Sequence, residues 1–152
     1  MSSGIATAKL AEEKPRNTSY GPTISIVSGV PSQVWRGEPI AITVKVVFSN
    51  SEKIHPDTHF ALNISLRDSQ DHKYVNGLHG PLTTCLESFM NDIGQSTGVF
   101  KSIAIHKVGC FRLRVLLAAS SWSQTTVKAR ADSDVIEVIE CKNVVRPTLP
   151  LF

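Results

Sequence analysis

Apolar side chains recur at every second position in three separate stretches of this chain, and this period constrains the fold more than any other feature. Side chains two residues apart point to the same face of a β-strand, so such a stretch can bury one face and expose the other. The sequence therefore predicts half-buried strands at residues 40–48, 60–66 and 111–117. The stretch at 40–48 shows the period most clearly, with Ile40, Ile42, Val44, Val46 and Phe48.

Shorter strand patterns and turn signals complete an all-β arrangement. Residues 23–27, 125–129 and 134–140 also have strand patterns, and glycine, proline, serine or aspartate residues lie between the segments. About seven short strands separated by turns are typical of an immunoglobulin-like antiparallel β-sandwich, which is the fold that we expect.

Residues 98–117 are predicted to form a β-hairpin. Residues 98–105 and 110–117 each have a strand pattern, and only a short turn ending at Gly109 separates them. The residues expected to share one face of the first strand are Val99, Lys101, Ile103 and Ile105.

Residues 82–93 depart from the period of two. Their apolar residues have the spacing i, i+3, i+4, i+7 and i+8, which fits a short helix inserted between strands. A loop that crosses the edge of the sandwich with its apolar side inward fits equally well, and both alternatives are kept. The apolar residues are Leu82, Cys85, Leu86, Phe89 and Met90.

The chain has the size and composition of one globular domain. It has 152 residues, of which 41% are apolar and 19% are charged, and a chain of this kind can bury a sizeable core. We expect a flexible arm at residues 1–20, a β-sandwich domain at 21–145 and an extended tail at 146–152.

Cellular location is predicted from segments that the chain lacks. No stretch approaches the ~18 apolar residues of a membrane-spanning helix, and the polar N-terminus has no apolar core of a signal peptide. The three cysteines cannot all pair within the chain. We expect an intracellular protein, cytoplasmic or nuclear, with no membrane partner.

The order of motifs in the second half of the chain carries a family signal. GVF at residues 98–100 and IAI at 103–105 precede GCFRLRV at 109–115, and LHGPL stands upstream at 78–82. This order resembles the fungal velvet domain, in which a short Leu-x-Gly segment precedes a strand, a glycine turn and an aromatic-Arg-Leu-Arg strand. SDVIEV at 133–138 is similar to the closing strand of that family.

The velvet resemblance implies a fold and a kind of function. Velvet proteins are regulators of fungal development and secondary metabolism, they fold as a Rel-like immunoglobulin sandwich, they dimerise, and several bind DNA. The resemblance thus implies a sandwich that acts through contacts with a second velvet-like chain or with itself. The family begins with an arginine-rich segment, whereas residues 21–27 here carry no basic cluster. Because phosphate contacts need several cations on one surface, the sequence argues against a nucleic-acid partner.

Candidate catalytic residues are sought among histidines and tyrosines, because no phosphate-binding loop, nucleophile elbow or dinucleotide motif is found. No cofactor is expected. Pro56 places the histidines around it in a turn rather than on one helix face, so no metal site is expected. A histidine can act as a general base near neutral pH. The candidates are His55, His59, Tyr74, His79 and His106.

Candidate binding residues are exposed aromatic side chains and paired arginines. Trp122 stands in a serine-rich loop, where a tryptophan can anchor a partner. Arg112 and Arg114 share one face of their strand, and Phe89 with Met90 ends the apolar stripe described above.

Two functions of different classes follow. The first is an interaction module that pairs with a partner protein or with itself. The alternative is a cofactor-independent cyclase or isomerase, for example a pericyclic cyclase, that folds a hydrophobic fungal metabolite in a pocket of the sandwich. Such reactions need little beyond positioning and one hydrogen-bond donor.

Overall fold

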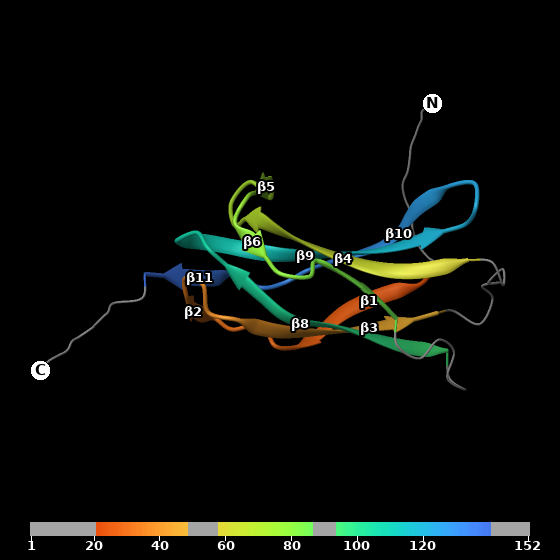
Figure 1. Cartoon of the computed structure of the whole chain (residues 1–152), viewed down its shortest axis with the longest axis horizontal. Coiled ribbons are helices and arrows are strands. Elements are labelled where there is room, and N and C mark those ends of the chain that lie inside the picture. The colour runs from red at the N-terminus through yellow and green to blue at the C-terminus, as the bar shows by residue number, and fades with distance from the viewer. Residues whose placement is uncertain (1–20, 49–57, 87–93, 141–152) are drawn as a thin grey trace, which may run out of the picture.

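The computed structural model describes residues 21–48, 58–86 and 94–140, and within these ranges it is all β, with eleven strands and no helix (Figure 1). The predicted arm at 1–20 and tail at 146–152 lie outside the described residues. The strands are β1 (Thr23–Ser28), β2 (Gln33–Trp35), β3 (Ile40–Val47), β4 (His59–Asp68), β5 (Tyr74–Val75), β6 (Leu78–His79), β7 (Thr83–Cys85), β8 (Gln95–Ile105), β9 (Gly109–Ser120), β10 (Thr125–Asp132) and β11 (Ile136–Ile139).

Two sheets form the layers of a sandwich, which confirms the predicted fold class (Figure 1). The four-stranded sheet has the order β1-β3-β8-β6. The seven-stranded sheet has the order β2-β11-β9-β4-β5, with β10 also paired to β9 and β7 also paired to β4. Most neighbours are antiparallel, and β2 with β11 is a parallel pair.

The core consists of the inward side chains of the long strands, as the period of two predicts. Ile42 and Val44 of β3 meet Leu62 of β4 and Leu113 of β9 in the interior, and all four are fully buried. Burial of each such side chain contributes about 1.5–3 kcal/mol to folding. At one end Phe48 meets the ring of Phe60 edge to face, with 5.0 Å between ring centroids.

The predicted hairpin at 98–117 is wrong, because β8 and β9 belong to different sheets. β8 pairs with β3 and β6, whereas β9 pairs with β4, β10 and β11. The short connection after His106 turns the chain from one layer to the other, and the amide of His106 donates to the carbonyl of Gly77 at 2.7 Å. Crossing between layers lets both strands turn their apolar faces to one core, which a two-stranded hairpin alone does not achieve.

The expected face of residues 98–105 is also wrong. Phe100 and Ile103 both face the core, while Lys101 and Ser102 between them are exposed. The register with β3 shifts at this point, which is a β-bulge. A bulge inserts residues into one strand of a pair and resets which side chains point inward. For this reason Val99 lies on the opposite face from Ile103.

The described part of the segment at 82–93 is a strand rather than a helix. Thr83–Cys85 forms β7, which pairs with Ala61, Leu62 and Asn63 of β4. The β-branched Thr83 and Thr84 suit an extended backbone, and the edge of β4 offers it hydrogen bonds. The crossing-loop alternative therefore describes residues 82–86 better than the helix, and Phe89 and Met90 lie outside the described residues.

The two long sides of the sandwich differ. On one side the segment from β5 to β7 passes from the edge of β4 to the edge of β8 and back, because β5 and β7 pair with β4 while β6 pairs with β8. We call this the closed side. On the other side the edge strands β1 and β10 lie beside each other without pairing. We call the side formed by β1, β10, the β9–β10 hairpin and the β10–β11 connection the open side.

Candidate functional site

A groove of about 500 Å³ lies on the open side. A volume of this size is within the range of sites that hold a small molecule or the side chains of a bound segment. Its walls come from β1, from the β1–β2 connection and from the end of β10 with the connection that follows. The residues that line it include Ile24, Ile26, Val30, Ala131, Ser133 and Asp134.

The groove exists because the two facing edges carry side chains of different size. Ile24 and Ile26 point inward from β1 but are only half-buried. Ala131 of β10 pairs with the core residue Val115 and so also points inward, where its single methyl group fills little of the space. A large side chain at this position would close the groove.

A tight turn after β1 supplies the end wall. Gly29 has a φ of 100°, and a Cβ there would overlap the carbonyl oxygen of Ala41. Only glycine fits so close to a neighbouring backbone in this left-handed conformation. The turn brings Val30 to the groove.

An ion pair fixes the opposite wall to the seven-stranded sheet. The guanidinium of Arg114 donates to both carboxylate oxygens of Asp132, at 2.9 Å and 3.2 Å, and the two side chains are only 13% and 24% exposed. The hydrogen bond from Arg114 lowers the pKa of Asp132, and the same bond raises the pKa of Arg114. Both groups therefore stay charged at neutral pH.

Ser133 provides a second attachment of the same wall. Its side chain is buried, and its Oγ accepts from the amide of Leu113 at 2.9 Å and donates to the carbonyl of Asp134 at 2.7 Å. The carbonyl of Ser133 accepts from Nη1 of Arg112 at 2.9 Å. The predicted binding residues Arg112 and Arg114 thus hold the groove wall in place.

The β9–β10 hairpin projects from the sandwich and belongs to the open side (Figure 1). Trp122 in its turn is 92% exposed, and Val127 on β10 is 57% exposed. Among the described residues, seven large apolar side chains are exposed, and four of them lie on the open side. Apolar exposure is therefore concentrated there, as is typical of a binding surface. The four residues are Val27, Trp122, Val127 and Val135.

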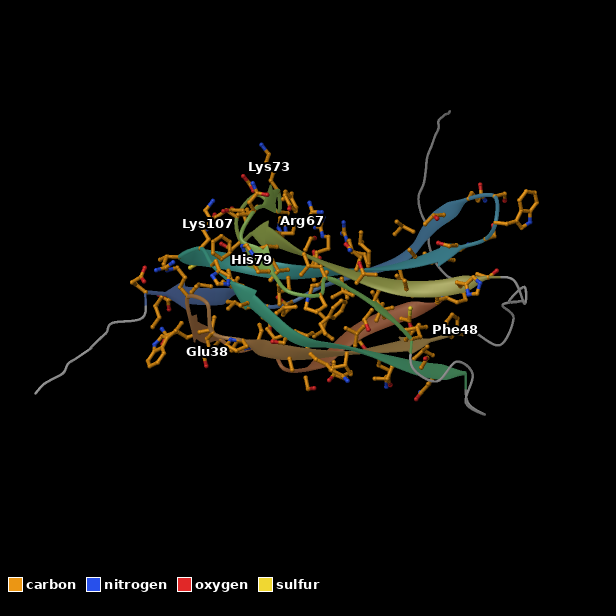
Figure 2. All side chains as sticks on the ribbon, viewed as in Figure 1. Glu38, Phe48, Arg67, Lys73, His79 and Lys107 are labelled. Carbon is orange, nitrogen blue, oxygen red and sulfur yellow. The ribbon has the colours of Figure 1, made fainter. Side chains whose placement is uncertain are left out.

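Two predicted catalytic residues meet at the other end of the sandwich. The rings of His79 and His106 are 4.5 Å apart, nearly perpendicular, and both residues are exposed. Figure 2 shows His79 at the same end as Glu38 and Lys107, away from Phe48. The lining of the groove includes no histidine or tyrosine. The structure thus separates these imidazoles from the groove.

The other candidates are dispersed. His59 is exposed at the start of β4, opposite Ser120. Tyr74 is exposed on β5, with its ring centroid 5.9 Å from the guanidinium carbon of Arg67. His55 lies outside the described residues.

Sequence reasoning missed the groove itself. Ala129 and Ala131 alternate with the charged residues Lys128, Arg130 and Asp132. This alternation of small and charged side chains indicates a strand that covers the core poorly. It was the one sequence pattern from which a groove at this strand could have been predicted. On the opposite wall, the inward face of β1 stays half-exposed because of how the two sheets are placed relative to each other. A local sequence pattern does not predict that placement.

In the ranges 21–48, 58–86 and 94–140, no three or more histidine, cysteine, aspartate or glutamate side chains are grouped as a metal site. No helix in the part of the chain that the structure describes is long and apolar enough to span a membrane.

Comparisons with known proteins show similarity of fold only. No protein-family model and no curated protein matches the sequence. The solved structure of AvmM, which catalyses macrocyclization in alchivemycin A biosynthesis, is similar with a TM-score of 0.50 and 11% identity, over 82% of this chain and 92% of that chain. A family 123 glycoside hydrolase from Clostridium perfringens has a TM-score of 0.41 and 8% identity, over 80% of this chain and 27% of that chain. A cohesin module from a family 33 glycoside hydrolase of the same organism has a TM-score of 0.33 and 11% identity, over 80% and 99%. The AvmM likeness, at this low identity, supports the sandwich fold and assigns no residue a role.

Proposed function

We propose that this chain is a protein-interaction module whose open side binds an extended segment of a partner protein. The observation that carries the proposal is the concentration of a groove, two strand edges and four exposed apolar side chains on one side of the molecule. A free strand edge presents amide and carbonyl groups to which an extended segment can add, and pockets between the sheets accept its alternate side chains.

The surface favours a different protein over a second copy of this chain. Both edges contain a bulge, between Ile26 and Ser28 in β1 and between Val127 and Ala129 in β10. β10 also exposes Lys128 and Arg130. The cations of β10 oppose pairing with β10 of a second copy, because like charges would face each other, and the bulge in each strand limits regular pairing to part of its edge. The fitting partner segment alternates apolar residues, which enter the groove, with acidic residues, which meet these cations.

The proposal includes the wider role that the velvet resemblance implies, in regulation of fungal development or secondary metabolism. That role stays a prediction, because it depends on the motifs at residues 78–82, 98–115 and 133–138 alone. Self-association of this chain is an outcome that the experiment below separates from binding of another protein.

A selection from peptides displayed on phage tests the binding surface, with the full chain as bait. We expect enriched peptides that alternate apolar and acidic residues, and whose binding is lost in Ala131→Phe because the phenyl ring fills the groove. The control Ala61→Phe adds the same ring to the outer face of β4 and should bind normally. No enrichment, or enriched peptides that bind Ala131→Phe unchanged, would contradict the proposal. Concentration-dependent dimerisation that Ala131→Phe abolishes would show self-association instead.

A second candidate function is cofactor-independent cyclisation of an apolar metabolite in the same groove. It is favoured by the mixed lining, in which Ile24, Ile26 and Val30 provide apolar surface while Ser133 and Asp134 provide polar groups. AvmM, which has a similar fold, is a macrocyclization catalyst. The apolar dye 1-anilinonaphthalene-8-sulfonate probes this candidate. Saturable fluorescence enhancement that Ala131→Phe removes and Ala61→Phe keeps would support it, and no saturable binding would contradict it.

A further inference from the structure

Two arginines face each other on the outer surface of the seven-stranded sheet. Arg67 of β4 pairs with Arg112 of β9 in the antiparallel register. Both point away from the core, since their neighbours Leu66 and Leu113 are fully buried. Side chains in such a pair have Cβ atoms about 4.5–5.5 Å apart, and like charges at this distance repel each other. The pair therefore opposes folding unless something offsets its charge.

Neither guanidinium has a carboxylate partner among the described residues. Arg67 donates to Oγ of Ser65 and to the carbonyl of His72, and both distances are 3.4 Å, long compared with the usual 2.9–3.0 Å. Arg112 donates through Nη1 to the carbonyl of Ser133, but its Nε is buried without a hydrogen-bond partner. A buried N–H of a charged group that lacks an acceptor lowers the stability of the fold. A ligand that supplies an acceptor to Nε of Arg112 would therefore be stabilising.

Nearby acidic groups are already engaged. Asp132 holds Arg114. In the turn after β4, the carboxylate of Asp68 accepts from the amides of Gln70 and Asp71, at 2.9 Å and 3.1 Å. The carboxylate of Asp71 accepts from the amide of Lys73 at 2.9 Å. Among the described residues, none of these carboxylates forms an ion pair with Arg67 or Arg112.

We propose that Arg67 and Arg112, with the hydroxyl of Tyr74, form a binding site for a phosphate group. Arg67 and Lys73 lie on the same outer side of the seven-stranded sheet (Figure 2). Tyr74 pairs with Arg67 across β5 and β4, so the three side chains form one row over three strands.

Charge and geometry favour phosphate over a single carboxylate. A phosphate monoester carries about two negative charges at neutral pH, which match two guanidinium groups. The planar fork of arginine binds phosphate through two parallel hydrogen bonds. The ligand is a phosphorylated small molecule or a phosphorylated side chain of a protein, since both present the same dianion. The site is on the outer face of the sheet, so it does not depend on the proposed function of the groove.

The test is a titration of the full chain, followed through the Nε–H signals of its arginines by NMR. Inorganic phosphate is added at constant ionic strength, with chloride as the matched anion. Saturable shifts of the Arg112 and Arg67 signals are expected with phosphate and not with chloride. Linear shifts, or equal shifts with chloride, would overturn the site by showing screening alone.

Variants locate the site. Arg67→Lys and Arg112→Lys are each expected to weaken phosphate binding about tenfold, because lysine keeps the charge but loses the bidentate fork. Arg130→Lys, on the same face but paired with Leu116, is the control and should bind as the wild type does. If Arg112→Lys fails to fold, Tyr74→Phe replaces it, with a weakening of about threefold from loss of one hydroxyl donor. Unchanged affinity in both Arg67→Lys and Tyr74→Phe would overturn the proposal.

A second arm identifies the source of the phosphate. A glycine-flanked phosphoserine peptide is compared with inorganic phosphate. Tighter binding of the peptide by about tenfold or more would support a phosphorylated side chain, and equal affinity would support a phosphorylated small molecule. Failure of both probes to bind would overturn the site.

Discussion

The closed and open sides of this sandwich treat their strand edges differently. On the closed side β6 pairs with β8 and β7 pairs with β4, and the amide of Ile64 donates to the carbonyl of Leu82 at 2.9 Å. On the open side β1 and β10 are left as edges, and Ile24 and Ile26 stay half-buried. Where the chain covers its own edge, the core is closed by local segments. Where it does not, bulges and charged side chains hinder pairing of the edge strands with other copies of this chain. A partner segment can then bury the apolar side chains that stay half-exposed.

Truncation of one isoleucine on each side should show the largest difference in stability. Ile105 is fully buried in β8 beside β6, so Ile105→Ala should lower the free energy of unfolding by about 4 kcal/mol through lost burial and a cavity. Ile26→Ala should cost about 1 kcal/mol, because its side chain is already half-exposed. Urea denaturation of both variants measures the two values. Equal losses of unfolding free energy in the two variants would contradict the view that the closed side is better packed than the open side.

Substitution of a glycine on the closed side tests how closely the segment from β5 to β7 must approach β8. Gly80 has a φ of 120°, and a Cβ there would overlap the carbonyl oxygen of Ser102. Gly80→Ala should lower the free energy of unfolding by about 3 kcal/mol, from backbone strain and the displaced contact. Gly21→Ala is the matched control, because nothing lies within 4 Å of its Cβ position. A loss no larger than in the control would mean that the segment is held loosely.

The ion pair that fixes the groove wall predicts a pH dependence. The pKa of Asp132 is lowered in the folded state by the hydrogen bond from Arg114. Its contribution to stability is therefore present above the unfolded pKa of about 3.9, and is lost as the pH falls through the folded pKa. Asp132→Asn should cost about 1 kcal/mol at pH 7 and should reduce the loss of stability on acidification. Free energies of unfolding of the wild type and of Asp132→Asn, measured from pH 7 to pH 2.5, test this pH dependence. The same loss of stability on acidification in both proteins would contradict a stabilising role of the ion pair.

The exposed tryptophan predicts the smallest change in stability and a large change in binding. Trp122→Ser should alter the free energy of unfolding by less than about 0.5 kcal/mol, since the side chain is almost fully exposed. It should weaken binding of a selected peptide about tenfold or more, as loss of an aromatic anchor does. Urea denaturation checks the stability and calorimetric titration of the peptide checks the binding, with Trp35→Ser at the far end as the control. Equal effects of the two variants on binding would argue against the hairpin as part of the site.

Local sequence pattern predicted the long strands and most of the core. The period of two in β3, β4 and the Phe111 to Leu117 part of β9 is confirmed by the burial of their alternate residues. It failed for β8, because the bulge at Lys101 and Ser102 resets the alternation without changing the composition. It also failed for the β8–β9 connection, since a tight turn looks alike whether it joins paired strands or crosses between layers.

Most of the candidate sites depend on register and on the placement of the sheets. Arg67 and Arg112 are 45 positions apart and become opposite only through the pairing of β4 with β9. His79 and His106 meet only because β6 pairs with β8. The exposed position of Trp122 could be predicted from sequence, because a loop position requires no tertiary information, and its role in binding stays a prediction.

Hydrogen exchange of backbone amides, with and without a selected peptide, tests the central claim that the open side binds a partner segment. In the free chain, outward-facing amides of β1 and β10 should exchange quickly, while those of β6 and β7 that are paired should exchange more slowly. On addition of the peptide, protection should rise at residues 23–28 and 125–132 and stay unchanged at 78–85. Protection that appears at 78–85, or that leaves β1 and β10 unchanged, would contradict the account.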